Sequence, residues 1–477
     1  MSYPTYAGTI DWYRFEYHQQ LELQRIAPFV VPVDILGYVL LVAYLMLRQK
    51  LSDASRIPVL SAIVITSIYN LRTSRTLGLA YGILIGISSA WCIALSVNLM
   101  FLLEPEKQYK RLISCSGSPK YKECPKRNID RTTQGQSMPL SSYARLFWIL
   151  DLLGSLRALH WYHGHTQAPE IATSGKKHPE NCPSFGRTLG KLLLIYLCID
   201  CLKEIIAIDP YFWGYTDYEP PGNIRTYLSG KLSLPSIDSV RTYRMIVAFA
   251  VLYVAVELIS TVGVLLFINI LGPSLAGTWG EEWAYSPQYG DLEAICTRGL
   301  QGFWGTWWHQ MFRSTLVSPT DAVINMLQVP RKGVIARVIR LVIAFSISGA
   351  IHAAGSHTMW GNTKPLNSFL FFFLQPAGIA VQILGSWGLS KLNPRIKVST
   401  HFRKAVNVLF TIFWLLHTFP LLADDFARGG LWLTEPFPIS VLQMLGLGSA
   451  SRARQIGFDY GLHVSLGRRW WQVGLAL

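Results

Sequence analysis

The chain has 477 residues, of which 51% are hydrophobic and 15% are charged. Soluble proteins carry about 25% charged residues, so this composition argues against a soluble enzyme and for a protein embedded in a membrane. The net charge of +15 does not indicate a nucleic-acid partner, because the basic residues lie between apolar blocks and not on a soluble module. Residues 1–20 lack the basic start and apolar core of a signal peptide, so we expect no cleaved leader.

Eight apolar blocks follow along the chain, and a bilayer-spanning helix requires about 20 such residues. The predicted spans cover residues 28–47, 57–70, 77–103, 189–208, 245–271, 334–355, 367–389 and 405–423. We therefore predict an all-α polytopic membrane protein with about eight transmembrane helices, within a range of about seven to ten.

The polar connections are unequal in charge. If residues 48–56 lie in the cytosol and the spans alternate, most of the other basic segments also fall on the cytosolic side, as the positive-inside rule requires. The longest insertion, residues 104–143, is rich in Lys, Ser, Pro and Gly, so we predict a flexible cytosolic loop there. Residues 144–164 carry Asp151 and Arg157 among apolar residues and indicate an amphipathic segment at the membrane interface.

Residues 272–332 combine many aromatic side chains with few long apolar runs. Their centre, GFWGTWWHQMFR at residues 302–313, holds Trp304, Trp307, Trp308, His309 and Arg313. Tryptophan favours the boundary between membrane and water, so one interpretation is an aromatic belt at the cytosolic interface. The other is that these rings wall a path for a substrate.

Ionisable side chains are costly inside a membrane span and are therefore candidates for function, and we consider five of those that fall inside predicted spans. His352 stands out because small residues surround it in FSISGAIHAAG, and Ser348 lies four residues earlier on the same helical face. A neutral imidazole at that position could accept a proton near pH 7. The alternative is a histidine that only packs between helices. The sequence assigns no role to the other four residues, although Glu257 is a candidate for pairing with a basic residue: Asp34, Asp200, Glu257 and His417.

Several other classes of site lack support. The dense cluster HWYHGH, with His160, His163 and His165, occurs once, whereas membrane di-iron oxidases need such boxes at several places, so we expect no metal. No G-x-S-x-G, P-loop or G-x-G-x-x-G is present, which argues against a hydrolase, a kinase and a dehydrogenase.

Two stretches together resemble a known family. LQGFWGTWWHQMFR (residues 300–313), followed by SISGAIHAAG (residues 346–355), is similar to the paired signature of membrane-bound O-acyltransferases, above all their wax-synthase-like branch in plants and fungi. In that branch L-x-x-F-W-G-x-x-W-[NH]-x-x-x-R precedes S-G-x-x-H. The motifs define a signature region at residues 272–356, and the spans extend the resemblance loosely over one membrane-embedded acyltransferase domain, residues 1–477.

The resemblance implies transfer of an acyl group from acyl-CoA to an alcohol inside a membrane chamber. His352 matches the family's essential histidine, the expected general base, and His309 matches its second polar position. Trp304, Trp307, Trp308 and Ser348 are expected to bind substrate.

Arg313 belongs to the same expected substrate-binding set, and with Arg331 and Lys332 it could hold the CoA phosphates. Fungal chains of this type resemble acetyltransferases acting on terpenoid or meroterpenoid alcohols in secondary metabolism. We therefore expect acetyl-CoA as co-substrate, a hydrophobic alcohol as acceptor, no bound cofactor and a multi-pass protein of the endoplasmic reticulum. A long-chain wax or sterol ester synthase, a membrane transporter and a membrane methyltransferase or prenyl-modifying enzyme remain alternatives.

Overall fold

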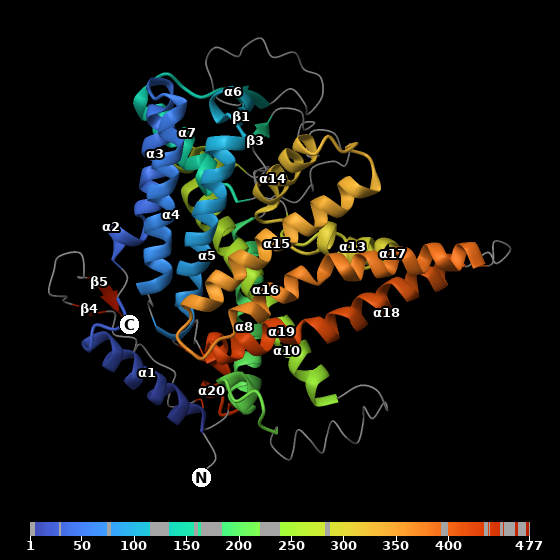
Figure 1. The fold of residues 1–477 in the computed structure, drawn as a ribbon. Helices are drawn as coiled ribbons and strands as arrows, with labels where there is room; N and C mark the ends of the chain where they lie inside the picture. The colour runs from blue at the N-terminus through green and yellow to red at the C-terminus, as the bar shows by residue number, and fades with distance from the viewer. Residues whose placement is uncertain are drawn as a thin grey trace.

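Long helices make up most of the molecule in the computed structural model (Figure 1). The structure describes residues 5–27, 30–73, 78–114, 133–156, 161–163, 184–219, 239–281, 287–392, 399–433, 437, 439–448, 452, 463–465 and 474–476.

The described residues of the first half of the chain form these α-helices: α1 (Tyr6–Glu22), α2 (Val31–Asp34), α3 (Leu36–Leu47), α4 (Arg56–Thr73), α5 (Gly78–Val97), α6 (Pro105–Gln108), α7 (Ser142–Gly154) and α8 (Phe185–Ile206). The second half continues with α10 (Ser239–Gly263), α11 (Gly272–Ala276), α12 (Glu293–Arg298), α13 (Leu300–Gly302), α14 (Arg313–Met326), α15 (Val334–Thr358), α16 (Pro365–Phe373), α17 (Gln375–Leu392), α18 (Thr400–Thr418), α19 (Pro420–Arg428) and α20 (Val441–Met444). Short 3₁₀ segments are η1 (Arg48–Lys50), η2 (Asp53–Ser55), η5 (Pro210–Trp213), η7 (Gly277–Gly280) and η10 (Leu431–Leu433), and π-helical segments are η3 (Asn98–Leu102), η6 (Val264–Leu271) and η9 (Phe303–Trp307).

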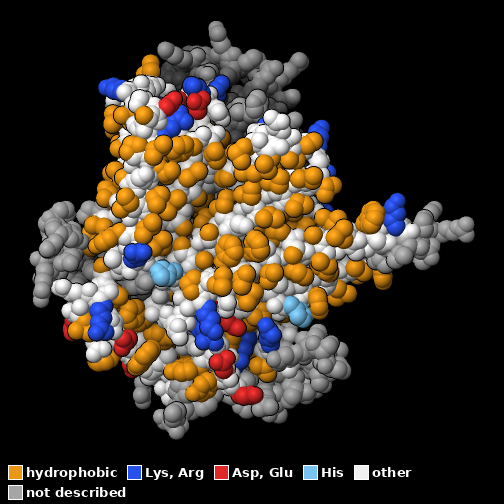
Figure 2. Space-filling view, viewed as in Figure 1, with side chains coloured by type: hydrophobic (Ala, Val, Ile, Leu, Met, Phe, Trp, Pro, Cys, Tyr) orange, Lys and Arg blue, Asp and Glu red, His pale blue; other side chains and the backbone are white. Residues whose placement is uncertain are grey.

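Six helical stretches of the described chain are long and apolar enough to cross a membrane: Asp53–Thr73, Gly82–Leu102, Ser239–Gly280, Val334–Thr358, Pro365–Gly388 and Thr400–Arg428. Each coincides with a predicted span, and together they support the predicted class of helical polytopic membrane protein. Hydrophobic side chains also cover most of the middle of the face in Figure 2, while Asp, Glu, Lys and Arg gather mainly toward its upper and lower ends.

Two of the eight predicted spans are not among these six. The block at 28–47 is broken after α2, where the Asp34 carboxylate accepts a hydrogen bond from the backbone N–H of Val30 at 2.7 Å, and α3 then has only 12 residues. The block at 189–208 does form a continuous helix, α8, but Lys191, Asp200 and Lys203 make it more polar than the other six.

Two small sheets among the described residues depart from a purely helical fold. β1 (Tyr109–Ser114) pairs antiparallel with β2 (Thr133–Gln136) and β3 (Trp161–His163), and β4 (His463–Ser465) pairs with β5 (Gly474–Ala476). β1 and β2 lie within residues 104–143, so part of the predicted flexible loop has regular structure. The sheet is fastened to α7 by the Arg111–Asp151 ion pair at 3.1 Å.

The crossing of α5 and α15 lies at the centre of the helical bundle (Figure 1). Thr358 on α15 donates a hydrogen bond to the carbonyl of Gly82 at 2.7 Å and accepts one from the N–H of Gly86 at 3.1 Å. A Cβ atom added at Gly86 would lie 2.0 Å from the carbonyl oxygen of Ala354. The two backbones therefore touch directly, as small residues allow in membrane bundles, and α15 is fixed at this point.

Candidate functional site

A cavity of about 1060 Å³ lies within the bundle, and helices α10, α14, α15, α16 and α18 contribute to its wall together with the π-helical segment η9. All seven site residues predicted from the sequence line this one cavity: Trp304, Trp307, Trp308, His309, Arg313, Ser348 and His352. Residues distant in the chain are thus brought together, and their chemical roles can be considered as one arrangement.

The ring of His352 has a defined orientation. Its Nδ1 atom lies 2.8 Å from the backbone carbonyl oxygen of Ser348. A carbonyl can only accept, so Nδ1 carries the proton and the other ring nitrogen, Nε2, keeps a free electron pair. The ring also packs on Phe372, with the ring centres 4.1 Å apart. His352 is therefore held in the tautomer that a general base requires, with its free nitrogen available at the cavity.

The His309 segment is built differently, because it contains no regular α-helix. Residues Phe303–Trp307 form a π-helix that ends with the N–H of Trp308 donating to the carbonyl of Phe303 at 2.7 Å. Such π-turns are rare and occur frequently at functional sites. The chain then reaches Phe312, whose φ of 68° is unusual for a side chain of that size, and α14 begins at the next residue.

Two side chains fasten this irregular segment. The Gln310 amide donates to the carbonyls of Trp304 at 3.1 Å and Trp308 at 2.6 Å. Arg313 in turn donates to the side-chain oxygen of Gln310 at 2.9 Å and to the carbonyl of Gly305 at 3.2 Å. Backbone carbonyls that lack a helical partner need other donors inside a protein, so Gln310 and Arg313 stabilise the conformation that presents His309.

The tryptophans pack inside the protein as well as lining the cavity, which favours the wall interpretation over the boundary belt. Trp307 stacks on Tyr253 with ring centres 6.1 Å apart, and Trp308 lies nearly parallel to Phe303 at 5.8 Å. The indole N–H of Trp304 donates to the side-chain oxygen of Gln375 at 3.1 Å. That N–H is thereby engaged, which leaves His309 as the stronger candidate to stabilise an oxyanion.

The positive charge at the cavity differs from the expected set. Arg313 lines the cavity as predicted, but Arg331 and Lys332 do not, and Arg337 and Arg340 of α15 take their place. The guanidinium of Arg331 instead donates to the Asn325 side chain. The missed signal was helical periodicity, because residues 340, 344, 348 and 352 recur every four positions and all line the cavity. Twelve residues of helix separate Arg340 from His352 by about 18 Å.

Four other residues that the sequence analysis singled out in the predicted spans lie outside the cavity wall: Asp34, Asp200, Glu257 and His417. Glu257 pairs with Lys191 of α8 at 2.6 Å, in the manner expected from the sequence, and Asp200 pairs with Arg452 at 2.7 Å. Asp34 caps the start of α2, and His417 donates through Nδ1 to the carbonyl of Phe413 at 2.8 Å. Their observed contacts are structural.

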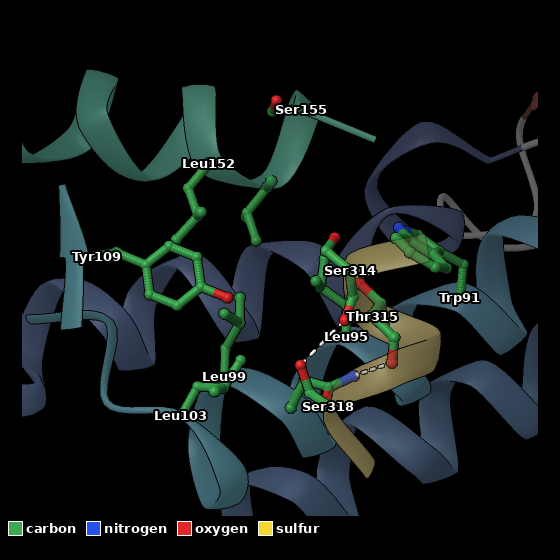
Figure 3. A pocket seen from close by; sticks show the side chains of 12 residues that line it. Trp91, Leu95, Leu99, Leu103, Tyr109, Leu152, Ser155, Ser314, Thr315 and Ser318 are labelled. Carbon is green, nitrogen blue, oxygen red and sulfur yellow. Dashed lines mark hydrogen bonds between the residues drawn. The ribbon is translucent and has the colours of Figure 1, made fainter. Parts of the chain in front are cut away.

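A second pocket lies on the other side of α14 and is much smaller, at about 20 Å³ (Figure 3). Tyr109 and Leu152 face Ser314 and Ser318 across it, and burial raises the pKa of the Tyr109 phenol, so its hydroxyl stays protonated. This volume accommodates a water molecule but not a substrate. Of the HWYHGH cluster, His160 and His165 fall outside the described residues, as does the side chain of His163.

Comparison with known proteins finds a similarity to one family. Residues 285–374 match the model of the membrane bound O-acyl transferase family. The match covers 90 of the 477 residues of the chain. The matched segment contains His309, His352 and the π-helix between α13 and α14.

Curated relatives are fungal. The chain is 32% identical to acetyltransferase eriL of Hericium erinaceus over 157 residues, which are 32% of this chain and 39% of the relative. It is 25% identical to acetyltransferase aurG of Calcarisporium arbuscula over 319 residues, 62% of this chain and 71% of the relative. It is 23% identical to O-mevalon transferase yanI of Aspergillus niger over 345 residues, 69% of each chain. The first of these matches spans well under half of its relative's length, and no solved structure matches the chain.

Proposed function

We propose that this protein transfers an acyl group from acyl-CoA to a hydroxyl group of a hydrophobic acceptor, and that the reaction occurs in the cavity between His309 and His352. The observation that carries the proposal is that these two histidines, from segments far apart in the chain, line the same cavity. A base and an oxyanion donor must both reach the reacting carbonyl, so a shared cavity is the minimum requirement for this chemistry.

The proposed reaction has one proton to move. Nε2 of His352 takes the proton from the acceptor hydroxyl while the hydroxyl oxygen attacks the thioester carbonyl carbon. His309 donates a hydrogen bond to the oxyanion that develops. The carbon–sulfur bond then breaks, the CoA sulfur leaves with the proton from the imidazolium, and the ester and free CoA are formed. His352 returns to its starting tautomer, which the Ser348 carbonyl favours.

Three cations support binding of the donor. Arg313, Arg337 and Arg340 line the cavity, and guanidinium groups pair well with phosphates. Because Arg340 lies about 18 Å along α15 from His352, the phosphates could bind there while an extended pantetheine arm carries the thioester to the histidine.

We further propose acetyl-CoA as the donor and a terpenoid or meroterpenoid alcohol of secondary metabolism as the acceptor. Support comes from the similarity to fungal acetyltransferases and from a cavity of about 1060 Å³, which is far larger than an acetyl group needs. We place the protein in the membrane of the endoplasmic reticulum, with the basic segments toward the cytosol.

The test uses membranes from a host that expresses the chain, compared with membranes from the host carrying an empty vector. Each is incubated with radiolabelled acetyl-CoA and, in parallel, with long-chain acyl-CoA, together with terpenoid alcohols, sterols and fatty alcohols. We expect labelled ester from acetyl-CoA and a terpenoid alcohol. Label only from the long-chain donor would replace the proposal with a wax or sterol ester synthase, and no ester from any pair would refute acyl transfer.

A further inference from the structure

The side-chain amide of Gln375 is fully buried behind the residues that line the cavity. Gln375, the first residue of α17, has 0% of its surface exposed and lies inside the apolar stretch Pro365–Gly388. It is one residue beyond the segment that matches the family model and does not line the cavity. An amide in such surroundings is costly unless its polar atoms are paired, so its position requires an explanation.

Both ends of the amide are engaged. The oxygen accepts the hydrogen bond from the indole N–H of Trp304 at 3.1 Å. The nitrogen donates to the carbonyl of Phe371 at 2.7 Å and lies 3.4 Å from the hydroxyl of Thr418. Gln375 therefore joins the π-helical segment η9 to α16 and α18 through a single side chain.

The Trp304 indole is the part of this network that faces the cavity. Its ring packs against Phe372, with centres 6.0 Å apart, and Phe372 packs on His352 at 4.1 Å. Phe345 covers another side of the indole at 5.5 Å. Rotation of Trp304 would thus disturb Phe372, the ring that supports the imidazole.

We propose that Gln375 is a positioning residue for acyl transfer: it fixes the Trp304 indole and, through Phe372, the orientation of His352. The inference rests on the proposed function. Gln375 contacts no reacting atom, and its effect passes through the side chains in front of it. Small displacements of a catalytic group cost up to about a hundredfold in rate, so loss of this hydrogen bond should lower kcat far more than it raises KM.

The experiment compares four purified proteins in detergent: wild type, Gln375→Met, Trp304→Phe and the double variant. Methionine matches the length of glutamine without its polar atoms, and phenylalanine lacks the indole N–H. We expect Gln375→Met to lower kcat about 10- to 100-fold with the KM for acetyl-CoA changed less than about threefold. In the Trp304→Phe background the same change should cost less than about twofold, because the hydrogen bond is already absent.

Thr418→Val provides the matched control, since it removes another partner of the same amide and leaves the Trp304 hydrogen bond in place. It should retain kcat within about twofold. An equal loss of kcat in Gln375→Met and Thr418→Val would overturn the positioning role. So would a double variant whose loss of kcat equals the product of the losses in Gln375→Met and Trp304→Phe.

Thermal unfolding of the same proteins separates failure of this inference from failure of the proposed function. If the Tm changes of the two single variants are not additive in the double variant, the contact between Trp304 and Gln375 exists. If the wild type then transfers no acyl group, the proposed function is refuted although the contact is real. Transfer by wild type with an unchanged kcat in Gln375→Met would refute the positioning role alone.

Discussion

The two histidine segments reach the same cavity by different structural means. His352 lies on a regular helix, and its ring is oriented by a carbonyl of that same helix. Glycines 82 and 86 of α5 then fix the helix by direct backbone contact. His309 lies on irregular chain after a π-helix, and side chains from within the segment and from α17 hold that chain in place.

This difference shows which contacts hold each of the two histidines in place. A helix satisfies its own backbone, so small residues at the crossing with α5 are enough to place His352. Irregular backbone needs donors other than its own helix, and Gln310 and Arg313 supply them to carbonyls of the His309 segment, while Gln375 holds the Trp304 indole. Substitutions that remove one side chain or one contact at a time should therefore distinguish the contacts that hold His352 from those that hold His309.

The largest expected effect is the loss of the base. His352→Ala should lower kcat by about 10²–10⁴-fold without loss of folded protein, as measured by ester formation at matched protein levels. His417→Ala is the matched control, because His417 makes the same Nδ1 hydrogen bond to the carbonyl four residues earlier but lies outside the cavity. Equal activity in the two variants would remove His352 from the reaction.

Loss of the second histidine should have a somewhat smaller effect. His309→Ala removes the proposed oxyanion donor and should lower kcat by about 10²–10³-fold in the same assay. His309→Asn retains a donor at a position where the family resemblance allows Asn or His, and should recover a large part of the rate. If Asn is no better than Ala, donation by His309 is not its role.

The contact between α5 and α15 can be disrupted by a substitution that changes neither histidine. Gly86→Ala places a methyl group against the carbonyl of Ala354 and should destabilise the protein by about 1–3 kcal/mol, read as a lower Tm in detergent. Gly385→Ala on α17 is the control, since a Cβ there meets no atom within 4 Å. A Gly86→Ala protein as stable as wild type would show that the contact with α15 is not close-packed.

The smallest expected effect concerns the donor's phosphates. Arg337→Gln should raise the KM for acyl-CoA about tenfold and leave kcat nearly unchanged, because it removes a charge from the binding site only. Arg331→Gln tests the alternative, since Arg331 is engaged with Asn325 outside the cavity wall. A larger effect at Arg331 would restore the assignment made from sequence.

Apolar periodicity and the sequence motif were sufficient to predict the part of the site that lies on α15, with Ser348 and His352. Six apolar blocks form helices long enough to span, and all seven predicted site residues line one cavity. His352 and Ser348 share a face because both lie on one helix, which spacing alone dictates. The same four-residue spacing, continued toward the start of α15, would have found Arg340.

The motif also identified Trp304, Trp307, Trp308 and His309, but the sequence did not predict the irregular backbone on which they lie. The π-helix of Phe303–Trp307 and the left-handed Phe312 depend on hydrogen bonds from distant or unpatterned residues, and no local signal marks Gln375 as a partner of Trp304. The break at Asp34 combines the local hydrogen bond from Val30 with one from the distant Asn70 side chain, and strand β1 depends on pairing with β2 and β3.

The most direct test of the central claim is an experimental structure of the protein with a non-hydrolysable acyl-CoA analogue. We expect the analogue's carbonyl group between His309 and His352, within about 2.6–3.2 Å of a His309 ring nitrogen, with the phosphates near Arg337 and Arg340. An analogue bound outside this cavity, or bound within it with its carbonyl remote from both histidines, would contradict the account.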